Sequence, residues 1–337
     1  MKRTMALILA AVTTLGILSG CGSKPEQVYT NDQTPLPAKK ETITLKIGQL
    51  PVADGLPFWV GEVKNYYKEQ GINVELMTFA SAQERDAAIT AGEIDGMLAD
   101  PIAAATLVAS GAKVKIASLG LGATQTEGPM GILAAPKSGI TKVEHLKGVE
   151  IAISAGSVMH YVTEKLLLEN GMKLEEIKVT NIPKIPVRFE SLIGGQVKAA
   201  ILPDPFFSLA ASKGARIILN DAEAKQNYSL SVIIFAEKAL TDKAQGVKDF
   251  FIAYNRAVND IRLNPQGYSD LLVDPKYGKL PADVKDPKVY KNVPPSFAQA
   301  PKKEDLESVV QWLVEKEFIK STLTYEQLVD DSLLPKK

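Results

Sequence analysis

The feature that most constrains the fold is a junction that the chain builds twice. "LADPIAAATLVASGAKV" occupies residues 98 to 114, and "LPDPFFSLAASKGARI" occupies residues 202 to 217. Each segment starts with leucine, one residue and Asp-Pro, continues through small residues, and stops at Gly-Ala before a basic residue. Asp prefers the N-cap of a helix and Pro prefers its first turn. Each copy therefore predicts a strand that passes directly into a helix.

The two junctions belong to a longer repeat with an offset of about a hundred residues. In each copy a strand precedes a helix that ends in "EQGI" (69 to 72) or "ENGM" (169 to 172), and the Asp-Pro junction follows later. Strands that alternate with helices in this way predict parallel sheets covered by helices. The alternative is that this order is common α/β grammar without a true repeat.

We therefore predict an α/β fold of two Rossmann-like lobes joined by two crossover strands. The segments "MGILAAPK" (130 to 137) and "LSVIIFAEK" (230 to 238) are the expected crossovers. They divide the chain into lobe 1 (42–133 and 233–337) and lobe 2 (134–232). Only helices are expected after the second crossover, and we expect these C-terminal helices to pack on lobe 1.

The N-terminus predicts export. A basic start, an apolar run from Met5 to Leu18 and small residues before Cys21 are typical of a signal peptide, here residues 1–20. "LSGC" at 18 to 21 resembles the lipobox of bacterial lipoproteins, which implies cleavage before Cys21 and a lipid on its sulfur. The alternative is a chance cysteine in an ordinary signal peptide. The polar, proline-bearing residues 21–41 then form a flexible tether.

Composition narrows the class of partner. The formal net charge is +0 and no basic run is present, so nothing in the charge pattern favours nucleic acid. Cys21 is the only cysteine, which leaves the mature chain without a disulfide or a cysteine-based metal site. We expect no metal and no cofactor, and a monomer, because a two-lobed clamp is complete by itself.

Most of the chain from Thr42 onward resembles the substrate-binding proteins of bacterial ABC importers. The resemblance lies in "IGQLPVADGLPFWVGEVKNYYKEQGINVEL", "AAITAGEIDGMLADPIAAATLVASGAKVKI", "GITKVEHLKGVEIAISAGS" and "AAILPDPFFSLAASKGARII". The chain looks most like the nitrate, sulfonate and taurine group, which includes thiamine-pyrimidine binders. The resemblance implies a periplasmic-binding-protein type II fold that closes by a hinge on a small ligand and docks on a membrane permease.

The ligand cleft is expected where strand ends of the two lobes face each other. Asp100 and Asp204 follow strands there, either as plain helix caps or as caps that also border the ligand. Ser154, Gly156 and Ser157 close another strand and could offer backbone N–H groups at a helix N-terminus, although Ser157 also suits a plain N-cap.

Further candidates come from loops near the same cleft. Asp54 could accept a bond from a ligand amine, and an aromatic face could stack on a ring, with core packing as the alternative for the aromatics. His160 either reaches the cleft or packs elsewhere. Arg188 could bind an anion bidentately, or be a solvated surface residue. At most one of Phe206 and Phe207 is expected to face the cleft. The remaining candidates are Phe58, Trp59, Ser81, Gln125, Thr126 and Glu127.

Carboxylates outnumber cations among these candidates, which favours a neutral or amine-bearing organic ligand. Two other functional classes stay open. An enzyme on the same fold is disfavoured because no nucleophile elbow, metal cluster or acid with a dedicated base is evident. A lipid-anchored ligand sensor would have the same sequence features as a transport protein.

Overall fold

The computed structural model describes residues 42–125, 127 and 130–336. The predicted signal peptide (1–20), the lipidated Cys21, the tether (21–41) and the candidate Thr126 lie outside the described residues.

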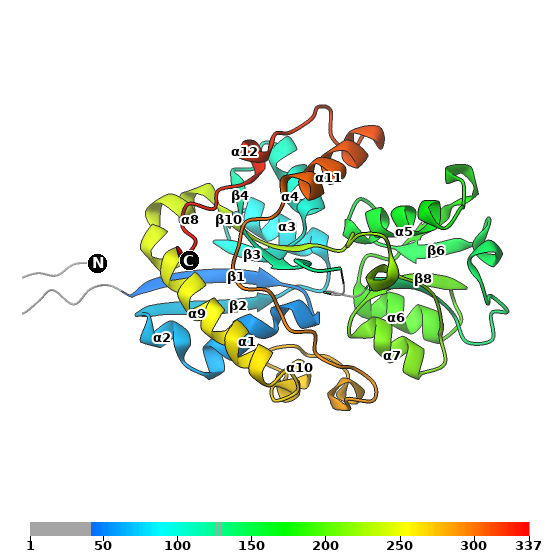
Figure 1. The fold of residues 1–337 in the computed structure, drawn as a ribbon, viewed down its shortest axis with the longest axis horizontal. Helices are drawn as coiled ribbons and strands as arrows, with labels where there is room; N and C mark the ends of the chain where they lie inside the picture. Colours follow the sequence, from blue (N-terminus) through cyan, green and yellow to red (C-terminus); the bar gives the residue numbers. More distant parts are fainter. Residues whose placement is uncertain (1–41, 126, 128–129, 337) are drawn as a thin grey trace, which may run out of the picture. The chain divides into compact units, whose positions relative to one another are not determined.

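Within that part of the chain, two five-stranded sheets form the centres of two lobes (Figure 1). The order of the first sheet is β2-β1-β3-β10-β4 and that of the second is β7-β6-β8-β5-β9. The strands of the first sheet are β1 (Ile43–Gln49), β2 (Ile72–Thr78), β3 (Gly96–Ala99), β4 (Val114–Leu121) and β10 (Ser231–Ala236). Those of the second are β5 (Met130–Ala134), β6 (Glu150–Ile153), β7 (Lys178–Asn181), β8 (Ala199–Pro203) and β9 (Arg216–Asn220).

The two sheets have the same topology. In each, the first strand of the copy pairs in parallel with the second and third, as β1 does with β2 and β3 and as β6 does with β7 and β8. One antiparallel strand then lies next to the third strand, β10 in the first sheet and β5 in the second. The predicted two-lobed α/β fold with a repeated plan is confirmed.

The two segments expected as crossovers form strands that belong to one lobe each, β5 in lobe 2 and β10 in lobe 1. The lobe boundaries expected after residues 133 and 232 fall inside β5 and β10. Each strand pairs within one sheet only, since β5 pairs with β8 and β9 and β10 with β3 and β4. The chain therefore crosses between lobes just before each of these strands.

Helices cover both sheets (Figure 1). Lobe 1 begins with α1 (Leu56–Val63), α2 (Tyr66–Glu69), α3 (Ala82–Thr90) and α4 (Pro101–Ala109). Lobe 2 has α5 (Val158–Glu169), α6 (Ile185–Ile193) and α7 (Phe206–Ser212). After β10 come α8 (Glu237–Asp242), α9 (Ala244–Leu263), α10 (Ser269–Val273), α11 (Lys303–Glu315) and α12 (Tyr325–Leu328). Helix α9 packs on α1, α2 and β1, and both α11 and α12 pack on α4, so the C-terminal helices cover lobe 1 as predicted.

The local sequence explains the packing. Every residue of β3 and of β8 is buried, because helices lie on both faces of these central strands. Helix α9 buries Phe250, Tyr254 and Val258 at helical spacing, and Phe250 meets the Phe58 ring edge-on. The helix expected to end in "EQGI" is interrupted at Asn65, whose φ of 59° ends α1 before α2 begins. Asn tolerates this left-handed conformation better than most residues.

Candidate functional site

A cavity of about 80 Å³ lies where the ends of strands from both sheets meet. Lobe 1 contributes the residues after β1, β3 and β4, and lobe 2 contributes the start of β5, the first turn of α5 and the end of β8. A single water needs ~10–15 Å³ of such space. The cavity therefore suits a ligand of a few heavy atoms, at the position that open α/β sheets favour for binding.

Both Asp-Pro junctions border this cavity. Asp100 follows β3 and caps α4, because its Oδ1 accepts a bond of 2.9 Å from the Ala103 N–H. Asp204 follows β8, and its Oδ1 accepts a bond of 2.9 Å from the Ser208 N–H. Both carboxylates are buried and both line the cavity. The structure thus combines the two alternatives, since each aspartate holds a helix start and also borders the cavity.

Asp54 is the third carboxylate of the cavity. It lies in the short 3₁₀ segment Ala53–Gly55 between β1 and α1, and its Oδ2 accepts a hydrogen bond from the Ser231 hydroxyl at the start of β10. Burial raises the pKa of Asp54, and the Ser231 bond offsets only part of this effect. Burial also raises the pKa of Asp100 and of Asp204 to about 6. The charge of Asp54 adds to the rise at Asp204, so the two lobes are electrostatically coupled here.

Arg85 of α3 is the cation of the cavity, and the sequence analysis missed it. Its Nη1 donates to the Leu98 carbonyl of β3 at 3.0 Å, and its Nε donates to Asp86 Oδ1 at 2.9 Å. Its Nη2 lies 2.8 Å from the same Asp86 oxygen without hydrogen-bond geometry. A usable signal existed, because Arg85, Ala88 and Ile89 share one buried face of α3.

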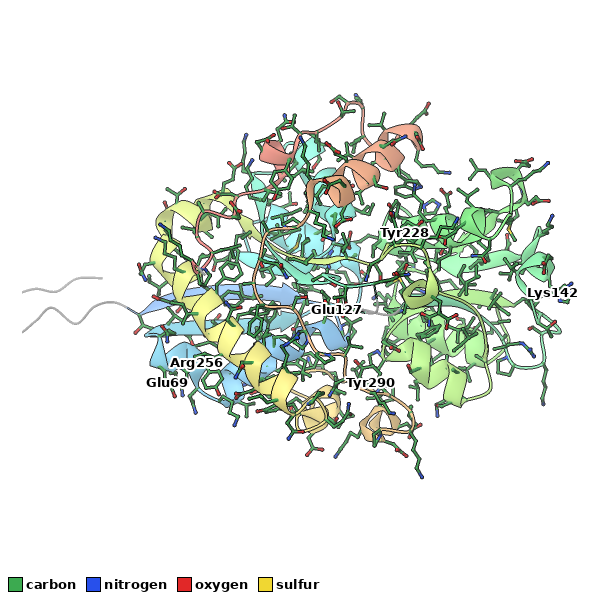
Figure 2. The ribbon with its side chains drawn as sticks, viewed as in Figure 1. Glu69, Glu127, Lys142, Tyr228, Arg256 and Tyr290 are labelled. Carbon is green, nitrogen blue, oxygen red and sulfur yellow. The ribbon has the colours of Figure 1, made fainter. Side chains whose placement is uncertain are left out.

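The C-terminal region also reaches the cavity. Tyr290 (Figure 2) and Asn292 line it from the segment between α10 and α11, and both side chains are buried. Asn292 donates its Nδ2 to the Pro265 carbonyl at 2.7 Å, whereas its buried Oδ1 has no hydrogen-bond partner. Nothing in this polar, proline-rich stretch indicated such a position, because only the tertiary path of the chain brings it there.

The predicted backbone site at Ser154, Gly156 and Ser157 does not line the cavity. Its N–H groups are used within the chain, since the Ala155 N–H donates to Asn181 Oδ1 at 3.0 Å and the Gly156 N–H donates to His160 Nδ1 at 3.4 Å. The Ser157 hydroxyl accepts from the Met159 N–H at 3.2 Å. Ser157 is thus a plain N-cap of α5. The neighbours Val158 and Met159 line the cavity instead.

His160 faces the C-terminal helices rather than the cavity. Its Nε2 lies 3.3 Å from Glu164 Oε1 on the same helix. Its ring packs edge-on against Trp312 and Phe318, with ring centroids 5.3 and 5.8 Å away. The position belongs to a contact between α5 and α11, so the prediction of a ligand contact is not supported by its surroundings.

The aromatic candidates belong to the core. Phe58 and Trp59 are fully buried in lobe 1, where Trp59 Nε1 donates to Gln49 Oε1 at 2.9 Å. Phe206 packs on Phe189 of α6, with ring centroids 5.3 Å apart, and Phe207 is buried as well. None of these four rings is among the described residues that line the cavity, because they pack inside the lobes, Phe58 on Phe250 of α9 and Phe206 on Phe189 of α6.

Arg188 is buried in lobe 2, so it is neither a solvated residue nor an anion site. Its Nε donates to the Ile201 carbonyl of β8 at 2.8 Å, and its Nη1 donates to the Ile182 carbonyl at 2.5 Å. Its Nη2 donates to the sulfur of Met159, which lines the cavity. Burial lowers the Arg188 pKa to about 9. Arg188 positions Met159 and the end of β8 from behind the cavity wall.

The remaining candidates, Ser81, Glu127 and Gln125, are not among the described residues that line the cavity. Ser81 caps α3, because its hydroxyl accepts from the Glu84 N–H at 3.3 Å. Glu127 lies in the crossing segment before β5 (Figure 2), where its Oε2 accepts from the Gly122 N–H at 3.0 Å and from the Ser296 hydroxyl at 2.6 Å. Gln125 is exposed beside it. These residues shape the surroundings of the cavity without lining it.

Residues 42–125, 127 and 130–336 contain neither a cluster of metal ligands nor a membrane-crossing helix. No three His, Cys, Asp or Glu side chains there converge as a metal site would require. No helix in these ranges combines the length and the apolar character needed to cross a bilayer.

Comparisons with known proteins show which folds the chain resembles and which family its sequence matches. No curated protein matched its sequence. Its fold is similar to the ligand-binding component of an ABC-type import system from Staphylococcus aureus with zinc bound, with 15% identity over 87% of this chain and 98% of that chain and a TM-score of 0.73. It is also similar to the alkanesulfonate-binding protein SsuA from Xanthomonas axonopodis pv. citri bound to MOPS, with 18% identity, coverage of 88% and 99%, and a TM-score of 0.71.

The desulfurization enzyme DSZB is a third similar structure, with 14% identity, coverage of 86% and 97%, and a TM-score of 0.64. At these identities the likeness concerns the fold alone. The sequence itself matches the family model described as NMT1/THI5 like over residues 53–267. Because that match covers well over half of the chain, the protein belongs to the NMT1/THI5-like family.

Proposed function

We propose that this chain is the substrate-binding component of an ABC importer, held by a lipid on Cys21 at the outer face of the cell membrane. It captures a small solute in the cavity between its lobes and delivers it to a membrane permease. The observation that carries the proposal is the cavity, which strand ends from both lobes close around buried polar groups. One of the similar structures is the ligand-binding component of an ABC-type import system and another is an alkanesulfonate-binding protein, which supports the same role.

The mechanism of ligand capture follows from the fact that both lobes contribute residues to the cavity lining. Asp54 and Asp100 belong to lobe 1, whereas Asp204 belongs to lobe 2. A solute that contacts all three favours the closed arrangement of the lobes over an open one by its differential binding energy. The permease then recognises the closed form. No covalent bond of the solute needs to be broken and no group transferred, so binding and release are sufficient for this function.

Native mass spectrometry of the full chain, purified without denaturation, is the first test. We expect a retained small mass that returns unchanged after release. The permease role is tested by solute uptake in cells that lack this chain, where we expect uptake of that solute to be lost. Intact uptake without the chain would contradict the transport role.

The alternative of an enzyme has one observation in its favour, the structural likeness to DSZB. Incubation of the chain with the solute separates the two functions. We expect the solute to be recovered unchanged, and a product formed at a rate that depends on enzyme concentration would establish catalysis instead.

The lipid anchor has its own test. The Cys21→Ser variant removes the sulfur that would carry the lipid. We expect this variant to leave the membrane fraction while its solute affinity stays unchanged. A Ser23→Ala variant, changed two residues away, is the matched control and should stay with the membrane.

A further inference from the structure

The charge of the cavity lining is predominantly negative. Asp54, Asp100 and Asp204 contribute three carboxylates, and Arg85 is the single cation among the described lining residues. The Arg85 guanidinium contacts Asp86, which is not part of the lining, while its Nη2 has no hydrogen-bond partner among the described residues. An anionic solute would therefore meet three carboxylates and one guanidinium that already contacts Asp86.

The described hydrogen-bond donors to the three carboxylates are neutral, and the charge of Arg85 offsets only part of the burial-driven rise in the pKa of Asp100 without forming an ion pair with it. Asp100 and Asp204 each accept from one backbone N–H, and Asp54 accepts from a serine hydroxyl. Among the described residues none of the three is within ion-pair distance of a lysine or arginine, in contrast to Asp86 beside Arg85. Buried carboxylates are costly without a counterion, which agrees with the raised pKa of all three. A cation placed among them would supply that counterion.

An unused acceptor points to N–H groups on the cation. The side chain of Asn292 is buried and lines the cavity, yet its Oδ1 has no hydrogen-bond partner among the described residues. The amide orientation is supported by the Nδ2 bonds to the Pro265 carbonyl at 2.7 Å and the Ser269 hydroxyl at 3.3 Å. A buried acceptor without a donor costs free energy, so a ligand N–H at this position would be favoured.

The remaining lining residues limit the size and the chemical type of the rest of the ligand. Tyr290 is the one aromatic ring among the described lining residues, whereas quaternary ammonium groups are usually held by several aromatic faces. The volume of about 80 Å³ leaves room for few heavy atoms. The apolar part of the wall includes Leu50, Leu56, Leu98, Met130, Met159 and Ile185.

We propose that the cavity takes a small organic cation with N–H donors, such as a primary ammonium or an amidinium on a short apolar body. Sulfonates, nitrate and quaternary ammonium ions are excluded by the same charge and shape. The inference rests on the proposed solute-binding role of this cavity and names its substrate class.

Probes that differ only in charge or in N–H content test the substrate class. Calorimetric titration of the full chain would compare three N–H cations (n-butylammonium, 1,4-diaminobutane and acetamidinium) with butan-1-ol, butane-1-sulfonate and tetramethylammonium. We expect at least one N–H cation to bind ten- to a hundredfold tighter than all three comparison compounds, because hydrogen bonds to charged groups contribute about 1.5–3 kcal/mol. The inference is overturned if no N–H cation binds at millimolar concentration, or if the sulfonate binds tighter.

Isosteric variants locate the effect. Asp100→Asn and Asp204→Asn remove one charge each, and Asn is as good a helix cap as Asp, so both variants should fold. We expect each to weaken binding of the best N–H cation about tenfold or more. The matched control is Asp95→Asn, since Asp95 lies at the opposite end of β3 from Asp100 and pairs with Lys243 at 2.8 Å. Equal loss in the control, or no loss in either test variant, would overturn the inference.

The outcomes separate this inference from the proposed function. Loss of uptake on deletion, together with a recovered solute that is an anion, leaves the transport role intact and removes the cation. Tight N–H cation binding with uptake intact after deletion leaves the cation and removes the transport role.

Discussion

The pKa of buried carboxylates is shifted in opposite directions in two regions where the lobes meet. In the cavity, burial raises the pKa of Asp100 and Asp204 to about 6. In the contact between α5 and α11, burial acts on Glu164 in the same direction, but hydrogen bonds from His160, Lys316 and Trp312 outweigh it and lower the pKa to about 2. The charge of Glu164 is thus stabilised by donors of the chain itself, whereas Asp100 and Asp204 are available to the donors of a ligand.

The geometry of the α5–α11 contact explains the difference. Trp312 Nε1 donates to Glu164 Oε2 at 2.8 Å, and Lys316 Nζ lies 2.7 Å from Glu164 Oε1. The Tyr161 hydroxyl also meets the Ser308 hydroxyl at 2.9 Å. This contact ties lobe 2 to the C-terminal helices without a ligand. Among the described residues no lysine or arginine forms an ion pair with the cavity carboxylates, although the charge of Arg85 offsets part of the burial-driven rise in the pKa of Asp100, so a ligand that supplies donors would stabilise their charged forms. Four predictions test this contrast.

The largest effect is expected at Glu164. The Glu164→Ala variant should lower the free energy of unfolding by about 3 kcal/mol, because the Trp312 N–H and the Lys316 ammonium lose a shared buried acceptor. Urea unfolding measures the change. Glu307→Gln is the control, since Glu307 forms an exposed pair with Lys303 on α11 and should contribute less than about 0.5 kcal/mol. Similar losses in both variants would mean that the contact holds no special stability.

The pH dependence of stability should differ between the two regions. Glu164 has a folded pKa of about 2, below its ordinary 4.5, so its contribution is present above pH 4.5 and is lost as the pH falls toward 2. Asp100 and Asp204 have folded pKa values of about 6, above their ordinary 3.8, so their contribution is lost as the pH rises from about 4 through about 6.

Each limb is expected to amount to about 1–2 kcal/mol in the ligand-free protein. Urea midpoints measured from pH 2 to pH 8 give both limbs in one series. The acid limb should shrink in Glu164→Gln, and the limb between pH 4 and pH 6 should shrink in the Asp100→Asn, Asp204→Asn double variant. A double variant with an unchanged upper limb would contradict the assignment of that limb to the cavity.

Without ligand, the cavity carboxylates should cost stability. We expect Asp204→Asn to raise the free energy of unfolding by about 1 kcal/mol at pH 7, because it removes a buried charge and keeps an acceptor for the Ser208 N–H. At pH 4 the gain should vanish, since the aspartate is then protonated in the fold. Thermal unfolding at the two pH values measures both, and a loss of stability at pH 7 would show that the charge is compensated.

The sequence was sufficient for the plan of the fold and for the Asp-Pro junctions. Both depend on local rules, namely strand and helix periodicity and helix capping. The sequence did not predict the roles of side chains that depend on which residues pack against them in the tertiary structure. Trp59 could serve a cleft or a core, and Arg188 was expected in the cleft or on the solvated surface, whereas the packing of the fold buries both. Tyr290 reaches the cavity from a stretch far along the chain, a contact that no local pattern carries.

The smallest effect is expected at His160, which faces the α5–α11 contact from its edge. His160→Gln should lower the free energy of unfolding by only about 0.5–1 kcal/mol, because edge-on ring contacts with Trp312 and Phe318 are lost while Lys316 and Trp312 still hold Glu164. Urea unfolding at pH 7 measures this loss, and affinity for the best N–H cation should stay unchanged. A weakened affinity in this variant would place His160 within the binding region after all, and the contrast between the two regions would then fail.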